Sequence, residues 1–159
     1  MPSKIVKECV AALVRQNLRI AFAESATAGR FASELALVPK SGFVLMGGIV
    51  CYDAGVKTSL LNVPESLICD HTAESAEVTR ALAENLRTQF DAEVLVAITG
   101  LASPGGSETD SKPVGTMFLH IILPETAISH TEIFNGSQEE IILQAIDKGC
   151  ELIVKKLHS

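Results

Sequence analysis

Short, largely apolar runs alternate along the chain with segments in which apolar residues recur at helical spacing. The runs over residues 18–23, 44–52 and 94–99 are each bounded by polar or turn-forming residues. Helical spacing is found over residues 5–14, 28–35 and 74–90. A nearly continuous apolar strand is typical of a sheet that helices cover on both faces. The alternation therefore predicts an α/β fold, arranged as a three-layer α/β/α sandwich.

The last third of the chain predicts a β-hairpin followed by a helix over residues 137–156. Residues 114–123 and 127–134 have strand composition and are separated only by a Pro-Glu-Thr turn, so they should pair antiparallel. The sheet should thus be mixed, mostly parallel and about five-stranded, with this hairpin at its end. Gly47 and Gly48 interrupt the second strand and indicate a bulge or a close backbone approach. No repeat or linker divides the chain, so residues 1–159 are expected to form one domain.

Composition limits the classes of function. The chain is 47% hydrophobic and 20% charged, which is typical of a globular domain. Its formal net charge is −6 and it has no basic run, which argues against nucleic-acid binding. The longest apolar stretch, residues 42–51, is too short to span a bilayer, and the first residues lack the apolar block of a signal peptide. We therefore expect a cytoplasmic protein that binds neither nucleic acid nor a membrane.

The cysteines and histidines do not have the spacing of metal ligands. The four cysteines are scattered at positions 9, 51, 69 and 150, without a C-x-x-C pair, and the four histidines are equally dispersed. In a cytoplasmic chain such cysteines are expected to be small buried apolar residues. We expect neither a metal nor a cofactor.

Chemically useful side chains follow three of the predicted strands. Residues 24–27 follow the first strand, residues 52–57 the second, and Thr99 and Gly100 end a later one. Ligands of open α/β sheets bind at the carboxyl ends of strands. We therefore expect these three segments to meet at one edge of the sheet.

Ser25 lies where the first strand gives way to a helix. Unpaired N–H groups of the first helical turn could there stabilise the oxyanion of a tetrahedral intermediate formed on its hydroxyl. The alternative is that Ser25 or Thr27 only caps the helix, the commonest role of Ser and Thr at such a position.

Lys57 is the candidate base for Ser25, because no histidine is suitably placed. An unperturbed lysine titrates near ~10.4, and a pKa of ~7–8 requires about 4 kcal/mol of preference for the neutral amine. Partial burial and the positive end of a helix, which Asp53 could cap, both favour the neutral form. Tyr52 could orient the amine or pass a proton. The alternative is an ordinary solvated lysine.

Each of three other features, a loop and two side chains, has two possible roles. The loop of residues 100–107 can present N–H groups to an anion or serve only as a flexible connection. Glu24 can position a catalytic group or form a structural hydrogen bond. Cys51 can be nucleophilic, although a strand cysteine is more often part of the core.

Five segments, in this order, resemble motifs of the C-terminal-domain family of the competence/damage-inducible protein CinA, which includes stand-alone nicotinamide-mononucleotide deamidases. Residues 23–29 (AESATAG) resemble A-E-S-C-T-G-G, and residues 52–57 (YDAGVK) resemble Y-x-x-x-x-K. Residues 71–75 (HTAES) resemble H-G-A-V-S, and residues 99–106 (TGLASPGG) resemble T-G-I-A-G-P-x-G-G. Residues 112–116 equal K-P-V-G-T. The likeness covers nearly the whole chain.

The resemblance implies a Ser/Lys amidohydrolase that converts nicotinamide mononucleotide and water to nicotinate mononucleotide and ammonia, in pyridine-nucleotide salvage. It assigns the nucleophile to Ser25 and the base to Lys57, and it gives Tyr52 a supporting catalytic role. It implies no metal or cofactor. The positions at which it implies substrate contacts are Thr27, Ala28, Thr99, Gly100, Ala102 and Gln138. Small α/β enzymes of this kind commonly form symmetric assemblies, so we also expect a homo-oligomer.

Several residues depart from the family motifs. Ala26 and Ala28 replace a cysteine and a glycine, and Ser103 replaces a glycine. Residues 134–142 resemble F-x-G-x-R-x-x-V-R, but Gln138 and Ile142 replace both arginines. Loss of one charge-assisted contact to a phosphate is worth roughly 1.5–3 kcal/mol, so roughly ten- to hundredfold weaker binding of the mononucleotide is expected. The competing hypothesis is therefore a degenerate family member that binds or interacts without catalysis.

Overall fold

A computed structural model describes all 159 residues. Along the chain the elements are α1 (Lys4–Gln16), β1 (Ile20–Glu24), α2 (Arg30–Ala36), η1 (Ser41–Phe43), β2 (Leu45–Val50), α3 (Ala54–Leu61), α4 (Glu65–His71), α5 (Ala76–Asn85), η2 (Leu86–Thr88), β3 (Val94–Gly100), β4 (Thr116–Ile122), β5 (Ala127–Ile133) and α6 (Gln138–Leu157). Their order is the one predicted from the alternation of apolar runs and helical spacing.

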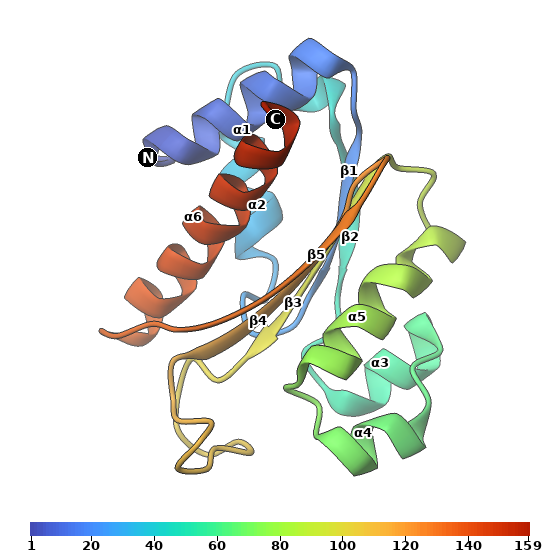
Figure 1. Cartoon of the computed structure of the whole chain (residues 1–159), viewed down its shortest axis with the longest axis vertical. Helices are drawn as coiled ribbons and strands as arrows, with labels where there is room; N and C mark the ends of the chain where they lie inside the picture. The colour runs from blue at the N-terminus through green and yellow to red at the C-terminus, as the bar shows by residue number, and fades with distance from the viewer.

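The five strands form one mixed sheet in the order β2-β1-β3-β4-β5 (Figure 1). β1 pairs in parallel with β2 and β3, whereas β4 pairs antiparallel with β3 and β5. The predicted mixed sheet with a C-terminal hairpin is confirmed, and β4 alone runs against the other four strands. Because β1, β2 and β3 run in the same direction, their carboxyl ends lie at one edge of the sheet.

Helices cover both faces of the sheet, which confirms the three-layer sandwich. Figure 1 shows α1, α2 and α6 on one face and α3, α4 and α5 on the other. Each face has its own apolar core, of which the one beneath α1, α2 and α6 is the larger. The Phe22 and Phe31 rings, 4.7 Å apart between centroids, join β1 to α2 in that larger core.

The outer strands are less buried than their composition predicts. β1, β3 and β4 are buried along almost their full length, but burial alternates along β2 and β5. Met46 and Val50 of β2 are exposed. The expectation of burial on both faces therefore fails for β2, because this apolar strand lies at the edge of the sheet.

The two glycines of β2 lie at both a bulge and a close backbone approach, the two features that they indicated in the sequence. The register between β1 and β2 shifts by one residue, since Ile20 pairs with Leu45 and Ala21 with Gly47. A Cβ atom at Gly48 would lie 2.8 Å from the Phe22 carbonyl oxygen. The bulge and the close approach together determine where the chain leaves β2 and enters the segment that carries Lys57.

Three of the four cysteines are buried as expected, whereas Cys69 on α4 is exposed. Cys69 was expected to be buried, but no residue of α4 is fully buried, and the helix packs on the core through Leu67 and Ile68. None of the helices combines the length and apolar character needed to cross a membrane.

Candidate active site

The side chains of Ser25 and Lys57 meet at the carboxyl edge of the sheet. Ser25 directly follows β1, and its N–H donates to the Ile98 carbonyl of β3. The Cys51 N–H donates to the Glu24 carbonyl, which continues the β1–β2 pairing past the strand ends and brings residue 52 beside Ser25. The Asp53 carboxylate then caps α3 by accepting from the Gly55 N–H at 2.8 Å, as predicted. Lys57 lies one turn into this helix.

The Lys57 amine is surrounded by three oxygen atoms. Its Nζ lies 3.0 Å from Ser25 Oγ, 2.6 Å from the Cys51 carbonyl oxygen and 3.4 Å from the Tyr52 carbonyl oxygen. Only 1% of Lys57 and 6% of Ser25 is exposed. The interpretation of Lys57 as an ordinary solvated lysine is therefore wrong.

This geometry suits a neutral amine that accepts a proton. The two carbonyl oxygens can only accept, so they take two N–H groups of the amine. The lone pair of the neutral amine is then directed at the Ser25 hydroxyl, which can donate its proton to the Lys57 nitrogen. Burial lowers the pKa of Lys57 and so favours the neutral form, against the raising effect of nearby negative groups, Glu74 and Asp53 among them. Burial also raises the pKa of the Cys51 thiol, which keeps that neighbour uncharged at neutral pH.

The turn after Ser25 differs from the one expected from sequence. α2 begins only at Arg30, and neither Ser25 nor Thr27 caps it. The Glu24 carboxylate instead accepts from the Phe31 N–H at 2.6 Å and from Thr27 Oγ1 at 3.1 Å. Glu24 thus has the structural role of the two considered, and burial raises its pKa.

The same turn leaves main-chain donors next to the serine hydroxyl. The N–H groups of Ala26 and Thr27 donate no hydrogen bond within the protein. These two free donors lie in the turn that precedes α2 and not in the first turn of a helix, where we expected such donors. Ala28 has a φ of 46°, in the left-handed region that favours glycine, which explains why the family motif has a glycine at this position.

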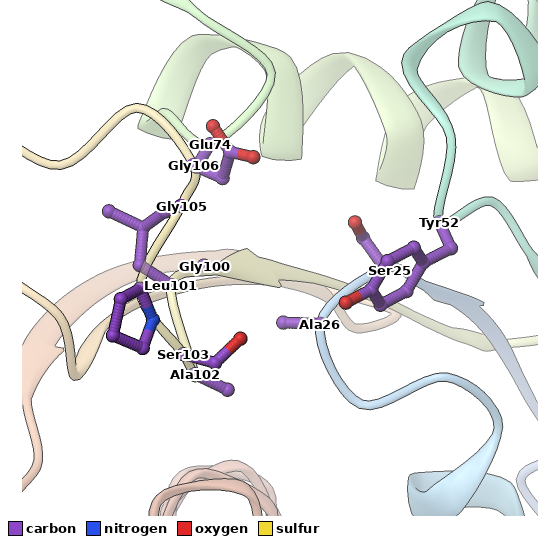
Figure 2. Close-up of a pocket in the computed structure, with 11 residues that line it drawn as sticks. Ser25, Ala26, Tyr52, Glu74, Gly100, Leu101, Ala102, Ser103, Gly105 and Gly106 are labelled. Atoms are coloured by element: carbon purple, nitrogen blue, oxygen red, sulfur yellow. The ribbon is translucent and has the colours of Figure 1, made fainter. Parts of the chain in front are cut away.

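A pocket of about 190 Å³ opens beside Ser25. Its wall consists mainly of the turn after β1 and the loop after β3 (Figure 2). The lining residues are Ser25, Ala26, Tyr52, Glu74, Gly100, Leu101, Ala102, Ser103, Pro104, Gly105 and Gly106. Gly100 is required by close packing, since a Cβ atom there would lie 2.6 Å from the Thr116 carbonyl oxygen.

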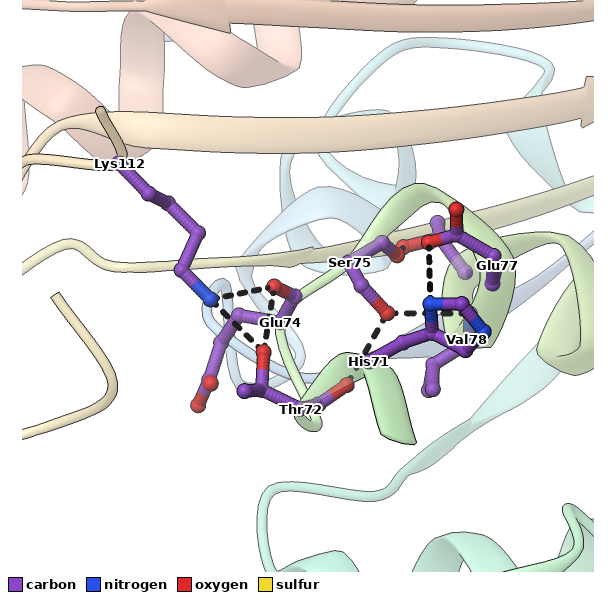
Figure 3. A network of polar contacts seen from close by, with 8 residues as sticks. His71, Thr72, Glu74, Ser75, Glu77, Val78 and Lys112 are labelled. Atoms are coloured by element: carbon purple, nitrogen blue, oxygen red, sulfur yellow. Dashed lines mark hydrogen bonds and ion pairs between the residues drawn. The ribbon is translucent and has the colours of Figure 1, made fainter. Parts of the chain in front are cut away.

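The loop after β3 is held in place from both sides. Lys112 Nζ donates to Thr72 Oγ1 at 2.7 Å and to the Glu74 carbonyl at 3.0 Å (Figure 3), and it also donates to Ser107 Oγ at 2.9 Å. These bonds join the loop to the turn between α4 and α5. Within the loop, the Glu108 carboxylate accepts from the N–H groups of Gly105 and Gly106, each at 2.8 Å. The loop is therefore an anchored wall and not a free connection.

Three of the supporting residues expected from sequence line the pocket: Tyr52, Gly100 and Ala102. Tyr52 contacts the amine only through its main-chain carbonyl, while its ring is 62% exposed and lies beside Ser25 (Figure 2). The expected role of the phenol in orienting the amine is therefore taken by the backbone.

Four expected substrate contacts lie outside the pocket. Thr27 turns its hydroxyl to Glu24, and Ala28 points to solvent at the strained turn. Thr99 is fully buried and its hydroxyl lies 2.9 Å from that of Thr79 on α5, so it does not line the pocket. Gln138 is an exposed first residue of α6. Thr27 and Thr99 match the family motifs and Ala28 and Gln138 depart from them, but none of the four lines the pocket.

Two groups at the site were missed from sequence. The Cys51 carbonyl is a main-chain atom, and no residue pattern points to it. Glu74 lines the pocket, and the signal for it was present: a carboxylate occupies the position at which the H-G-A-V-S motif has an apolar residue.

These features define a class of protein: a three-layer α/β domain with a buried serine–lysine pair under a glycine-rich loop at the carboxyl edge of its sheet. The family model for the CinA C-terminal domain matches residues 2–157. The chain therefore belongs to the CinA C-terminal domain family.

Relatives and solved structures agree with this assignment. A CinA-like protein from Desulfotalea psychrophila is 38% identical over 130 residues, which cover 82% of this chain and 31% of that protein. The chain spans about a third of the length of the curated relatives it matches. A CinA superfamily protein from Klebsiella pneumoniae superimposes with a TM-score of 0.91 at 24% identity, covering 98% of this chain and 96% of that one. One from Escherichia coli has a TM-score of 0.88 at 25% identity, covering 96% and 88%.

Proposed function

We propose that this domain is an amidohydrolase in which Ser25 is the nucleophile and Lys57 the general base. The observation that carries the proposal is the 3.0 Å contact between Lys57 Nζ and Ser25 Oγ, with both groups withdrawn from water. A buried lysine with a lowered pKa, next to a hydroxyl in a pocket, is the arrangement that activates a serine without histidine.

Acylation begins when Lys57 takes the proton of the Ser25 hydroxyl and Oγ attacks the carbonyl carbon of the amide. The N–H of Ala26, the residue after the nucleophile, stabilises the resulting oxyanion. The carbon–nitrogen bond then breaks, and the Lys57 ammonium returns its proton to the leaving nitrogen. Ammonia departs, and an ester on Ser25 remains.

Deacylation repeats these steps with water. Lys57 takes a proton from a water molecule that attacks the ester carbonyl, and the second oxyanion uses the same donor. The carbon–oxygen bond to Ser25 breaks, and Lys57 returns the proton to Oγ. A carboxylic acid leaves and gives its proton to water, and the serine–lysine pair is restored.

The family resemblance suggests nicotinamide mononucleotide as the substrate, with nicotinate mononucleotide and ammonia as products. The pocket volume of about 190 Å³ accommodates an amide with one aromatic ring and leaves the rest of a nucleotide outside. Such a size supports recognition of the reacting end of the molecule. It also agrees with the position of Gln138, outside the pocket.

Ammonia release from nicotinamide mononucleotide tests the proposal. Wild-type protein should release ammonia, and Ser25→Ala and Lys57→Met should each reduce kcat by at least about a thousandfold, since each removes a group that acts in both half-reactions. Ser103→Ala, which changes a pocket hydroxyl outside the dyad, is the matched control. Equal turnover in wild type and both dyad variants would exclude the mechanism. Absence of turnover in wild type on any pyridine carboxamide would favour the degenerate, binding-only family member, to which the missing arginines at positions 138 and 142 point.

A further inference from the structure

Glu74 is the only residue with a charged side chain among those that line the pocket. It precedes Ser75, the N-cap of α5, and Figure 2 shows its carboxylate on the wall formed with Gly105 and Gly106. One carboxylate oxygen, Oε2, accepts from Ser107 Oγ. The other, Oε1, accepts no hydrogen bond from the protein and remains available to a ligand.

Lys112, which donates to the same Ser107 hydroxyl that this carboxylate binds, does not line the pocket. Lys112 donates to the Glu74 main-chain carbonyl and to Ser107, and it offsets part of the negative charge without presenting a cation to a ligand in the pocket. Lys57 is committed to Ser25 and to two carbonyl oxygens, and its lowered pKa favours the neutral amine. The pocket therefore presents a negative potential to whatever binds in it.

A second feature favours the same kind of ligand. The Tyr52 ring is 62% exposed and lines the pocket mouth beside Ser25. A cationic ring is attracted to the face of a tyrosine, and it is also attracted to a carboxylate. No arginine or lysine lines the pocket to bind an anionic group.

We infer that Glu74 makes this site select amides whose ring carries a positive charge, the N-substituted pyridinium carboxamides, and that a phosphate on the substituent adds little to their binding. The inference rests on the proposed function only for the nature of the reacting group. It assigns discrimination between cationic and neutral amides to Glu74. It also separates recognition of the ring from recognition of any phosphate.

Binding to the Ser25→Ala protein, which cannot turn over its ligand, tests the assignment. The probes are 1-methylnicotinamide, a cation, and nicotinamide, its neutral counterpart, titrated by calorimetry. The cation should bind about tenfold more tightly, a difference equal to about 1.4 kcal/mol. Adding Glu74→Gln, which keeps the acceptor for Ser107 but removes the charge, should abolish this preference and leave the Kd of nicotinamide within about twofold.

Glu77→Gln is the matched control, because Glu77 is an exposed carboxylate three residues further on that does not line the pocket. An equal loss of affinity for both probes in Glu74→Gln, the same loss in Glu77→Gln, or no binding of either probe would overturn the inference. Nicotinamide riboside and its 5′-phosphate should bind within about threefold of each other. If the 5′-phosphate bound more than tenfold more tightly than the riboside, the claim that a phosphate adds little to binding would be refuted.

The two proposals fail separately. Charge-selective binding that depends on Glu74, without ammonia release by the wild-type protein, would retain the recognition site and remove the hydrolase. Ammonia release by the wild type with no effect of Glu74→Gln on charge preference would retain the hydrolase and remove the role of Glu74.

Discussion

Replacing Lys57 by methionine should make the stability of the protein less dependent on pH. Methionine has a similar length and no titrating group. It also removes three hydrogen bonds, to Ser25, the Cys51 carbonyl and the Tyr52 carbonyl, each worth about 0.5–1.5 kcal/mol. This loss is nearly constant with pH, whereas the cost of burying the amine is not. The pH dependence therefore isolates the titration of Lys57.

The sign follows from the lowered pKa of Lys57 in the folded state. Between that pKa and the ordinary value of 10.5, the unfolded chain binds a proton at Lys57 and the folded protein does not. The free energy of unfolding of the wild type then falls as the pH falls through this window, by at most about 1.4 kcal/mol per pH unit. The difference in stability should shift in favour of Lys57→Met by up to about 2.5 kcal/mol from pH 10 to pH 8. It should become flat once the pH is below the folded-state pKa.

Urea unfolding of both proteins at one-unit steps from pH 7 to pH 10 measures this difference. Lys4→Met, at a side chain that is 92% exposed, controls for general effects of removing one positive charge. Titration of all other groups cancels between wild type and variant. A difference that stays constant from pH 7 to pH 10, or that shifts in favour of the wild type as the pH falls, would refute the argument that Lys57 is held as a neutral base.

Three further predictions address the scaffold. Gly48→Ala places a Cβ atom 2.8 Å from the Phe22 carbonyl oxygen and should lower the free energy of unfolding by about 1–3 kcal/mol in urea. His120→Phe should raise the free energy of unfolding by about 1 kcal/mol, because Nδ1 of His120 is buried without a hydrogen-bond partner. Since burial lowers the pKa of His120, this gain in stability should grow as the pH falls through 6.5. Lys112→Met should speed amide hydrogen exchange over residues 101–113 while leaving β1 protected, as mass spectrometry would detect.

Much of the fold could be predicted because most of its strands are apolar runs and its helices have clear periodicity. The error at β2 has a simple cause: composition reports that a strand is apolar, but its neighbours in the sheet decide whether both of its faces are covered. The meeting of Ser25 and Lys57 was predictable for a topological reason, since parallel strands deliver their carboxyl ends to one edge.

The details of the site were less accessible because they depend on backbone conformation. The left-handed residues Ala28 and Gly29 precede α2, which begins only at Arg30, so the expected cap by Ser25 or Thr27 is absent. Thr99 has the position of a site residue, but its side chain points to Thr79. Glu74 departs from the family motif, but its place in the pocket depends on a turn that Lys112 holds through a long-range contact, which the sequence does not indicate.

The one-residue shift between β1 and β2 has a consequence for the order of events in folding. Ser25 and Lys57 are 32 residues apart, and the chain between them passes through the bulged strand. A slip of one residue would turn the side chains of β2 to the opposite face and carry residues 51–57 away from the serine. In the proposed mechanism, an activated hydroxyl therefore exists only in molecules whose edge strand has docked correctly, so nascent or misfolded chains would lack it.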